Sequence, residues 1–413
     1  MKKRIVIVGS ANTKSEQLAY LKEKIECRGH EVILMDVGMG GKAPIKTDVT
    51  SEEIARKAGR DIRDIIASKD RFDVTNAMSE GARLKALDLL SEGKLDGIVA
   101  LGGATIALIG SKVMAALPFG IPKVLAVPAA MPAYVSEWFG AKDVTVMQVI
   151  LEIAGMNDLM KNAISQIAGA ISGMVDEAFS YNAIALPSPS IAITEIGFSD
   201  QCAKNVEKLL VEKGYHVFIF HAQGVSDRAM DTLISQGFFD AVVDIVPAGL
   251  IEERFKGNRR GGMERLDAAG KRGIPQVWAP CCLNITGAGP TRVNREKYEA
   301  SGRVYKIDAM RAMARFPMDE LLIGAKLYAE KINAARGPIK LVVPLKGWSS
   351  LDREGSVLYD PAQDRLFIEE LKKHLTVSID IEEVDCNLEE MATAEALVNG
   401  IVELLKSENS IKN

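Results

Sequence analysis

The sequence carries the same series of apolar segments twice, and this repeat restricts the fold more than any other feature. A single match would mean little, but three matches in the same order indicate two structurally repeated domains. Each half also opens with a β-rich segment. At 413 residues the chain is too long for one ordinary core. The matching pairs are residues 29–36 with 214–221, 95–99 with 239–243, and 120–124 with 273–277.

The apolar segments predict strands of parallel sheets. Residues 5–8 are four β-branched residues in a row, as in a strand buried on both faces. Strands that alternate with helices imply a parallel sheet. Further strands are predicted at 31–36, 97–101, 122–127, 339–344 and 377–381. Helices are predicted at 50–67 with a break at Gly59, and at 77–91, 105–116, 158–175, 317–334, 361–374 and 388–405.

These elements predict an α/β protein of two tandem Rossmann-like domains, with a cleft between them. We expect the domains to span residues 1–184 and 185–413. The boundary is placed near residues 178–190, because Pro187-Ser188-Pro189 breaks helix and favours extended chain. Thr13 and Glu16 are spaced as a capping box for the first helix.

Composition argues against several classes of protein. The net charge of −4 gives no sign of a nucleic-acid partner. No segment approaches the ~20 apolar residues that cross a bilayer, and the opening apolar run is too short for a signal peptide. Five cysteines without regular spacing do not suggest a disulfide framework or a structural zinc site. Free thiols suit a reducing cytoplasm, where we expect the protein to be.

Ligands of open parallel sheets bind beyond the carboxyl ends of the strands, so the residues after each strand are candidates for a site. Helix-start amides could hold an anion, Lys14 could add charge, and Asp36 could accept from a ribose hydroxyl. Neither a Walker A motif nor GxGxxG is present, and Gly102-Gly103 could instead permit tight strand-to-helix packing. The candidates of the first half are Ser10, Asn12, Thr13, Lys14, Asp36, Gly38, Gly102, Gly103, Ala104 and Thr105.

In the second half, titratable side chains lie at the ends of the predicted strands. Glu195, His221 and Asp244 end its first three strands, and Cys281-Cys282 follows the fourth. Glu195 and His221 could serve as general acid and base. The alternatives are a hydrogen-bonded structural histidine, an aspartate that caps a turn, and cysteines that act as small hydrophobes.

Two loops of the second half have both a functional and a structural interpretation. Residues 261–265 follow a basic run, so they could receive an anionic group or form a surface loop. Residues 347–352 follow a buried strand, so they could reach the cleft. In the alternative interpretation, Trp348 only packs there.

Several segments follow one another in an order that is known from a protein family. They are residues 9–14, 36–38, 101–103, 116–124, 154–157, 220–222, 265–270, 273–277, 331–333 and 347–352. On these segments the chain resembles the Tm-one-like ATP-binding family, named for a tomato tobamovirus-resistance protein. The resemblance covers nearly the whole chain. It implies two Rossmann-like domains, homodimerisation and ATP binding, without an established reaction. The sequence departs from the family's glycine-rich pattern at residues 104–107 and 223–227.

Three hypotheses of function follow. In the first, the chain binds ATP, with the loop residues around the phosphates, Asp36 at the ribose, and Mg²⁺ held mainly by phosphate oxygens. We predict no metal site made by the protein alone. In the second, Glu195 and His221 act on a small carbonyl or carboxylate metabolite. In the third, the chain is a non-catalytic scaffold or pairs with a paralogue. Small residues at 157–175 indicate close helix packing, either between subunits or within a domain.

Overall fold

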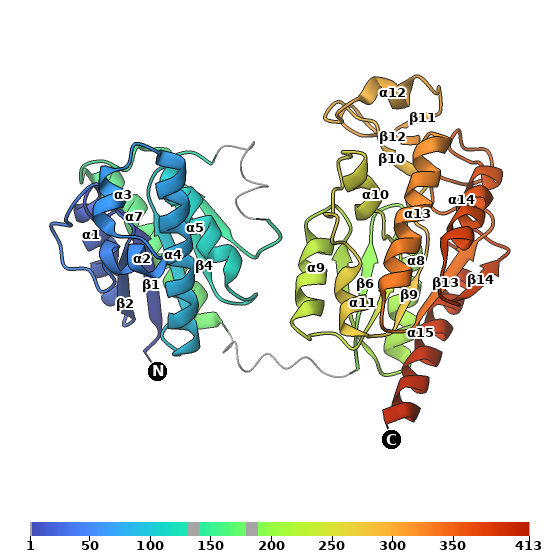
Figure 1. Cartoon of the computed structure of the whole chain (residues 1–413), viewed down its shortest axis with the longest axis horizontal. Coiled ribbons are helices and arrows are strands. Elements are labelled where there is room, and N and C mark those ends of the chain that lie inside the picture. Colours follow the sequence, from blue (N-terminus) through green and yellow to red (C-terminus); the bar gives the residue numbers. More distant parts are fainter. Residues whose placement is uncertain (1, 131–139, 179–188, 413) are drawn as a thin grey trace. The chain divides into compact units, whose positions relative to one another are not determined.

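The chain folds into two α/β units. The computed structural model describes residues 2–130, 140–178 and 189–412. It divides into unit 1, Met1–Ile184, and unit 2, Ala185–Asn413 (Figure 1). Each unit has a parallel sheet with helices packed against it, which confirms the predicted class of two tandem α/β domains with parallel sheets. The proposed boundary segment, 178–190, falls mostly outside the described residues.

Unit 1 is built on a five-stranded parallel sheet of order β2-β1-β3-β4-β5. Its strands are β1 (Arg4–Gly9), β2 (Glu31–Asp36), β3 (Gly97–Leu101), β4 (Lys123–Val127) and β5 (Thr145–Gln148). Its helices are α1 (Ser15–Glu26), α2 (Ser51–Lys57), α3 (Ile62–Ala67), α4 (Arg71–Ser91), α5 (Ala104–Ala116) and α7 (Asp158–Glu177). Ile5 and Ile7 face the core under α1 and α7, whereas Val6 and Val8 face α2, α4 and α5. The first strand is therefore buried on both faces, as predicted.

Unit 2 is built on a six-stranded parallel sheet of order β14-β13-β9-β8-β6-β7. Its strands are β6 (Ser190–Glu195), β7 (His216–His221), β8 (Ala241–Asp244), β9 (Gln276–Trp278), β13 (Ile339–Pro344) and β14 (Asp380–Val384). Its main helices are α8 (Asp200–Glu212), α9 (Ser226–Ser235), α10 (Gly249–Arg254), α11 (Asp267–Arg272), α13 (Met318–Ala334), α14 (Pro361–His374) and α15 (Met391–Lys412).

The two sheets share one strand order. Counted along the chain within each sheet, the order is 2-1-3-4-5 in unit 1, and unit 2 repeats it before adding a sixth strand. The direction of winding reverses between β1 and β3 in unit 1 and between β6 and β8 in unit 2. Ligands of such sheets bind at this reversal, beyond the carboxyl ends of the strands.

Unit 2 also contains an insertion that the sequence did not predict. β10 (Ile285–Gly287), β12 (Ala312–Arg315) and β11 (Val304–Lys306) form a small antiparallel sheet, with α12 (Arg295–Glu299) between β10 and β11 in the chain. It lies at one end of unit 2 (Figure 1). Strands of three or four residues are too short for a readable alternation of apolar and polar positions.

Several predicted boundaries need correction. The predicted break at Gly59 is confirmed, since α2 ends at Lys57 and α3 begins at Ile62. The predicted capping box of Thr13 and Glu16 is wrong: α1 begins at Ser15, and Thr13 lies in a turn whose amide donates to the Ser10 carbonyl. α4 begins six residues before the predicted start, because the Asp70 side chain caps it. β14 lies at Asp380–Val384, three residues later than predicted.

Candidate functional site

A cavity of about 490 Å³ lies where the winding of the unit 1 sheet reverses. The loop after β1 forms one side, and the turn between β3 and α5 forms the other. Every residue that we predicted for nucleotide binding lines this cavity, except Asp36 and Gly38. The lining residues are Ser10, Asn12, Thr13, Lys14, Met39, Gly40, Ile66, Arg71, Gly102, Gly103, Ala104, Thr105 and Ile106.

Gly102 and Gly103 have different roles at this cavity. A Cβ atom on Gly102 would lie 2.5 Å from Cγ1 of Ile106, so Gly102 permits the tight turn from β3 into α5. A Cβ atom on Gly103 would meet nothing within 4 Å. The packing interpretation is therefore correct for Gly102, whereas Gly103 borders open space.

The charges around the cavity favour an anion. Lys14 and Arg71 are its charged lining residues, and no carboxylate lines it within the part of the chain that the structure describes. The Lys14 ammonium donates to the Ile153 carbonyl and lies 3.6 Å from Oε1 of Glu152. α5 begins at the cavity, and its N-cap, Gly103, makes no side-chain cap. The first amides of α5 have no partner within the helix, so they carry partial positive charge there.

Asp36 does not line the cavity, but its side chain connects two loops. Its Oδ1 accepts hydrogen bonds from the amides of Ala11 and Gly38, each at 2.9 Å. The side chain is buried, and burial raises the pKa of its carboxyl against the lowering effect of those two amides. A Cβ atom on Gly38 would lie 2.5 Å from Oδ1 of Asn12, so Gly38 lets the loops approach each other. Both residues position the cavity wall; the ribose contact of Asp36 stays a prediction.

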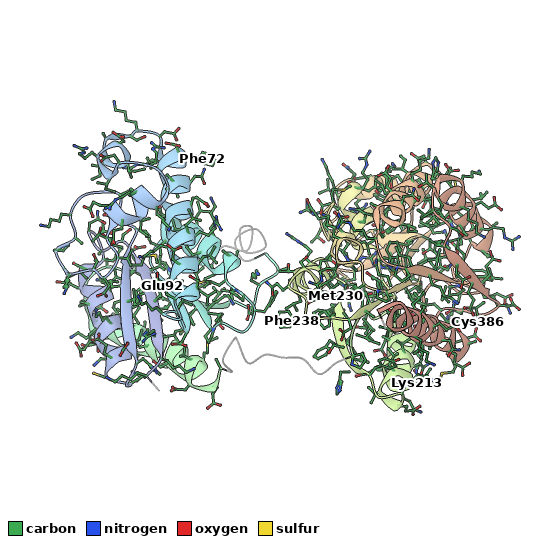
Figure 2. The ribbon with its side chains drawn as sticks, turned by 60° about the horizontal axis from the view of Figure 1, so that its bottom comes forward. Phe72, Glu92, Lys213, Met230, Phe238 and Cys386 are labelled. Atoms are coloured by element: carbon green, nitrogen blue, oxygen red, sulfur yellow. The ribbon has the colours of Figure 1, made fainter. Side chains whose placement is uncertain are left out.

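The sequence analysis missed five lining residues: Arg71, Met39, Gly40, Ile66 and Ile106. Arg71 was missed because the predicted helix began too late; the Asp70-Arg71 step is a helix-start signal that could have located it. Ile66 is 48% exposed, and Phe72, next to Arg71, is 79% exposed (Figure 2). Met39 and Ile66 provide apolar surface at the side of the cavity where β2 and α3 end.

In unit 2, Glu195 and His221 lie side by side as predicted. They are paired in register at the ends of β6 and β7, with Nδ1 of His221 3.2 Å from Oε2 of Glu195. His221 borders a second cavity, of about 260 Å³. Its lining residues are Ile196, Gly197, Phe198, His221, Gln223, Asn258, Arg259, Gly287, Gly289, Ile307, Met310, Arg311, Ala312 and Met313.

Asp244 does not join this pair. Its carboxylate is buried and lies 2.5 Å from Nη2 of Arg265. Asp227 and Asp231 lie 3.6 Å and 3.2 Å from the same guanidinium. The suggestion that residues 261–265 receive an external anion is therefore wrong for Arg265, because three aspartates of the chain already surround it.

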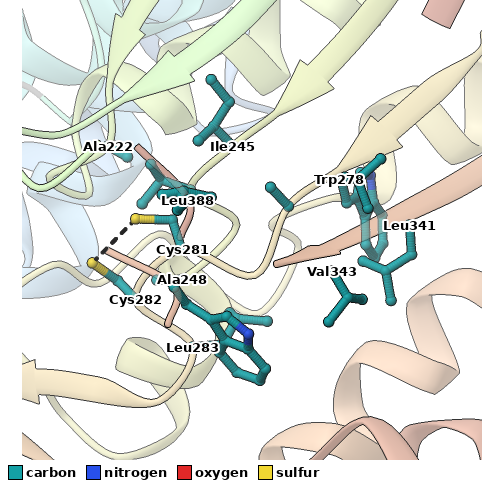
Figure 3. Packing of buried hydrophobic residues seen from close by; sticks show 14 of the residues in the cluster. Ala222, Ile245, Ala248, Trp278, Cys281, Cys282, Leu283, Leu341, Val343 and Leu388 are labelled. Carbon is teal, nitrogen blue, oxygen red and sulfur yellow. Dashed lines mark hydrogen bonds between the residues drawn. The ribbon is translucent and has the colours of Figure 1, made fainter. Parts of the chain in front are cut away.

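Cys281 and Cys282 are fully buried in the main apolar core of unit 2 (Figure 3). Their sulfur atoms are 3.7 Å apart, and burial raises the pKa of the Cys281 thiol. Neither residue lines the cavity at His221. Trp348 is also buried, with its ring against Phe367 and Nε1 donating to the Pro344 carbonyl. The packing interpretation is correct for all three side chains.

Within the described ranges, no cluster of three or more His, Cys, Asp or Glu side chains could hold a metal ion. Among the helices of those same ranges, none is long and apolar enough to cross a membrane.

The fold and its cavities define a two-unit α/β protein whose candidate sites lie at the carboxyl ends of parallel strands. Residues 3–180 match the N-terminal domain, and residues 188–405 the C-terminal domain, of an uncharacterised protein family, UPF0261. The chain belongs to this family. A UPF0261 protein of Clostridium tetani is 32% identical and covers 98% of this chain and 100% of its own.

Relatives also occur in tomato, as the family resemblance implied. The ToMV susceptible protein tm-1(GCR26) and the ToMV resistance protein Tm-1(GCR237) of Solanum lycopersicum are 25% and 24% identical to this chain. Each matches 97% of this chain over 56% of its own length. Among solved structures, a solute binding protein of an ABC transporter from Rhodopseudomonas palustris, in complex with 3,4-dihydroxy benzoic acid, matches with 14% identity, 81% coverage of each chain and a TM-score of 0.21.

Proposed function

We propose that unit 1 binds a ligand with phosphate groups in the cavity beside Lys14 and Gly103. The observation that carries this proposal is the charge of the cavity wall: two cations and a helix N-terminus, with no carboxylate among its described lining residues. Phosphate is bound well at such helix starts, because backbone amides and the helix dipole both favour negative charge.

Among such ligands we propose ATP, which the family resemblance implies. The cavity volume of about 490 Å³ falls within the range of small-molecule and cofactor sites. In this proposal, the amides of Gly103, Ala104 and Thr105 and the Lys14 ammonium hold the phosphates, and Arg71 adds charge. Met39 and Ile66 offer apolar contact for the base. Mg²⁺ would be held mainly by phosphate oxygens, since no described residue of the wall offers a carboxylate ligand.

Isothermal titration of the purified protein with ATP and magnesium tests this proposal. Lys14→Ala, Arg71→Ala and Asp36→Ala should each weaken saturable binding. Lys112→Ala is the matched control, because Lys112 lies on α5, outside the cavity lining, where its Nζ donates to the Asn76 side chain at 2.6 Å. Folded wild-type protein that takes up no ATP would remove ATP from the proposal and favour a scaffold role.

A second candidate function rests on the 3.2 Å contact between Glu195 and His221. A carboxylate that orients an imidazole at the edge of a cavity is an arrangement for general acid–base catalysis. The substrate would be a small carbonyl or carboxylate metabolite. His221→Ala should abolish a turnover found in a metabolite screen and leave the fold intact. Glu195→Gln should reduce turnover less, because the amide can still orient the imidazole.

A further inference from the structure

A buried group of charges lies beneath the cavity of unit 2. Oε1 of Glu252 accepts from Nη2 of Arg259 at 2.7 Å and from Oγ1 of Thr286 at 2.9 Å. Oε2 of the same carboxylate lies 3.5 Å from Nη1 of Arg292. The three charged side chains are at most 5% exposed. Two guanidiniums therefore share one carboxylate, which leaves one positive charge in excess within this group.

The two arginines differ in where they lie, because Arg259 lines the cavity and Arg292 does not. Arg292 donates to the Phe255 carbonyl and to Thr286, and its guanidinium lies 4.1 Å from the centre of the Tyr298 ring. Nη1 of Arg259 and Nε of Arg292 are both buried, and neither has a hydrogen-bond partner within the described segments. A buried cationic donor without an acceptor is unfavourable, and of these two donors only the one on Arg259 belongs to a residue that lines the cavity.

Cys282 is the competing counter-charge for Arg259. Burial raises the pKa of its thiol, but the hydrogen bond from Cys281, together with the charge of Arg259 and a hydrogen bond from it, outweighs burial and lowers the pKa. Cys282 is fully buried and does not line the cavity, whereas Arg259 does. The thiol thus lies on the core side, and it does not occupy the cavity.

The other residues of the cavity wall indicate what kind of ligand fits beside Arg259. Ile196, Phe198, Ile307, Met310 and Met313 make much of the wall apolar. No carboxylate lines it among the residues that the structure describes. A volume of about 260 Å³ admits a small organic molecule and is too little for a nucleotide.

We propose that this cavity binds a small carboxylate with an apolar substituent. The carboxylate pairs with the Arg259 guanidinium, the substituent packs on Phe198 and the methionines, and Asn258 and Gln223 supply further polar contacts. Charged hydrogen bonds of this kind are stronger than neutral ones, and they discriminate against uncharged analogues. Such binding requires neither a nucleotide in unit 1 nor proton transfer by Glu195 and His221.

Titration calorimetry with phenylacetate and its neutral amide, phenylacetamide, tests the proposal on the full chain. Phenylacetate should bind saturably, and phenylacetamide at least ~10-fold more weakly, because the amide offers Arg259 no charge. Gly197→Leu should abolish phenylacetate binding, since a Cβ atom there meets nothing within 4 Å and the side chain would fill the cavity. Gly173→Leu, the same change at an open position of unit 1, should leave binding unchanged.

Arg259→Gln should also abolish binding, but it leaves Glu252 with one partner fewer and can unfold unit 2. Gly197→Leu does not touch the buried charges, so it decides the question if Arg259→Gln fails to fold. Equal binding of the acid and the amide would overturn the proposal. So would full binding by Gly197→Leu, or no phenylacetate binding by folded wild-type protein up to ~10 mM, where even weak specific sites fill.

Discussion

Units 1 and 2 share a strand order but present different chemistry at the carboxyl edge of their sheets. In unit 1 the first two strands end at the paired residues Gly9 and Asp36; in unit 2 the corresponding pair is Glu195 and His221. The carboxylate of unit 1 is buried and holds two loop amides. The carboxylate of unit 2 holds an imidazole at the rim of a cavity.

The third strands extend this contrast. β3 leads into Gly102 and Gly103, which border an open cavity, whereas β8 ends at Asp244, which is buried against Arg265. In addition, the cavity of unit 2 is partly walled by residues of the inserted antiparallel sheet. The shared strand order therefore sets where a ligand can bind, and the loops set which ligand it can be.

The largest effect is expected when the ion pairs around the buried Arg265 of unit 2 are removed. Arg265→Leu leaves the buried Asp227 and Asp244 and the half-buried Asp231 without their cation, so unit 2 should lose about 3–5 kcal/mol of stability. Urea unfolding followed by the fluorescence of buried Trp278 and Trp348 measures this loss. Arg311→Leu is the control, because its pair with Asp308 is exposed and should contribute less than ~1 kcal/mol. An equal loss of stability in the two variants would contradict the view that the ion pairs around Arg265 stabilise unit 2.

The matching test in unit 1 concerns Asp36. Asp36→Ala leaves the amides of Ala11 and Gly38 without their acceptor, at about 1–3 kcal/mol each when they stay buried. Asp36→Asn retains an oxygen for both amides, so it should cost far less. The same pair separates two roles in ATP binding. If Asp36 only positions the loops, the Asn variant binds ATP like wild type; if it accepts from the ribose, that variant binds more weakly.

A smaller effect separates the two glycines of the β3–α5 turn. Gly102→Ala forces a methyl group against Ile106 and should destabilise unit 1 by about 1–3 kcal/mol. The methyl group of Gly103→Ala meets no atom within 4 Å, so this change should leave stability unchanged. A larger side chain, as in Gly103→Val, should then affect only the space for the ligand. Thermal unfolding and ATP titration of each variant measure the two effects. Loss of stability in Gly103→Ala would show that the turn, rather than the cavity, requires both glycines.

Much of the fold could be predicted from the sequence, because buried parallel strands such as residues 5–8 leave long apolar runs between glycine-rich ends. The loop residues around the unit 1 cavity and the Glu195–His221 pair followed from strand ends alone. The remaining features depend on contacts between distant segments. Nothing local in the sequence places Arg265 against three aspartates, or Arg259 between Glu252 and a cavity. The short strands of the inserted sheet carry too few residues for a pattern.

The smallest predicted effect is a change in how the stability of unit 2 depends on pH, and it tests the charged group around Arg265. Burial, with the charges of Asp244 and Asp227, outweighs Arg265 and raises the pKa of Asp231 from 3.8 to about 7. Between these values the folded state keeps a proton that the unfolded state releases, so stability falls as pH rises through this window and is constant above it.

Asp231→Asn removes this titration, so the loss of stability between pH 6 and pH 7.5 should shrink by roughly 1 kcal/mol. Urea unfolding at the two pH values measures the change. Asp308→Asn is the control, since the exposed Asp308 has a pKa lowered by its hydrogen bond with Arg311 and cannot produce a loss of this sign. An unchanged pH dependence in Asp231→Asn would place the titrating group elsewhere in unit 2. In that case Asp364, whose pKa burial and the charge of Asp352 raise to about 8, would be the next carboxyl to replace.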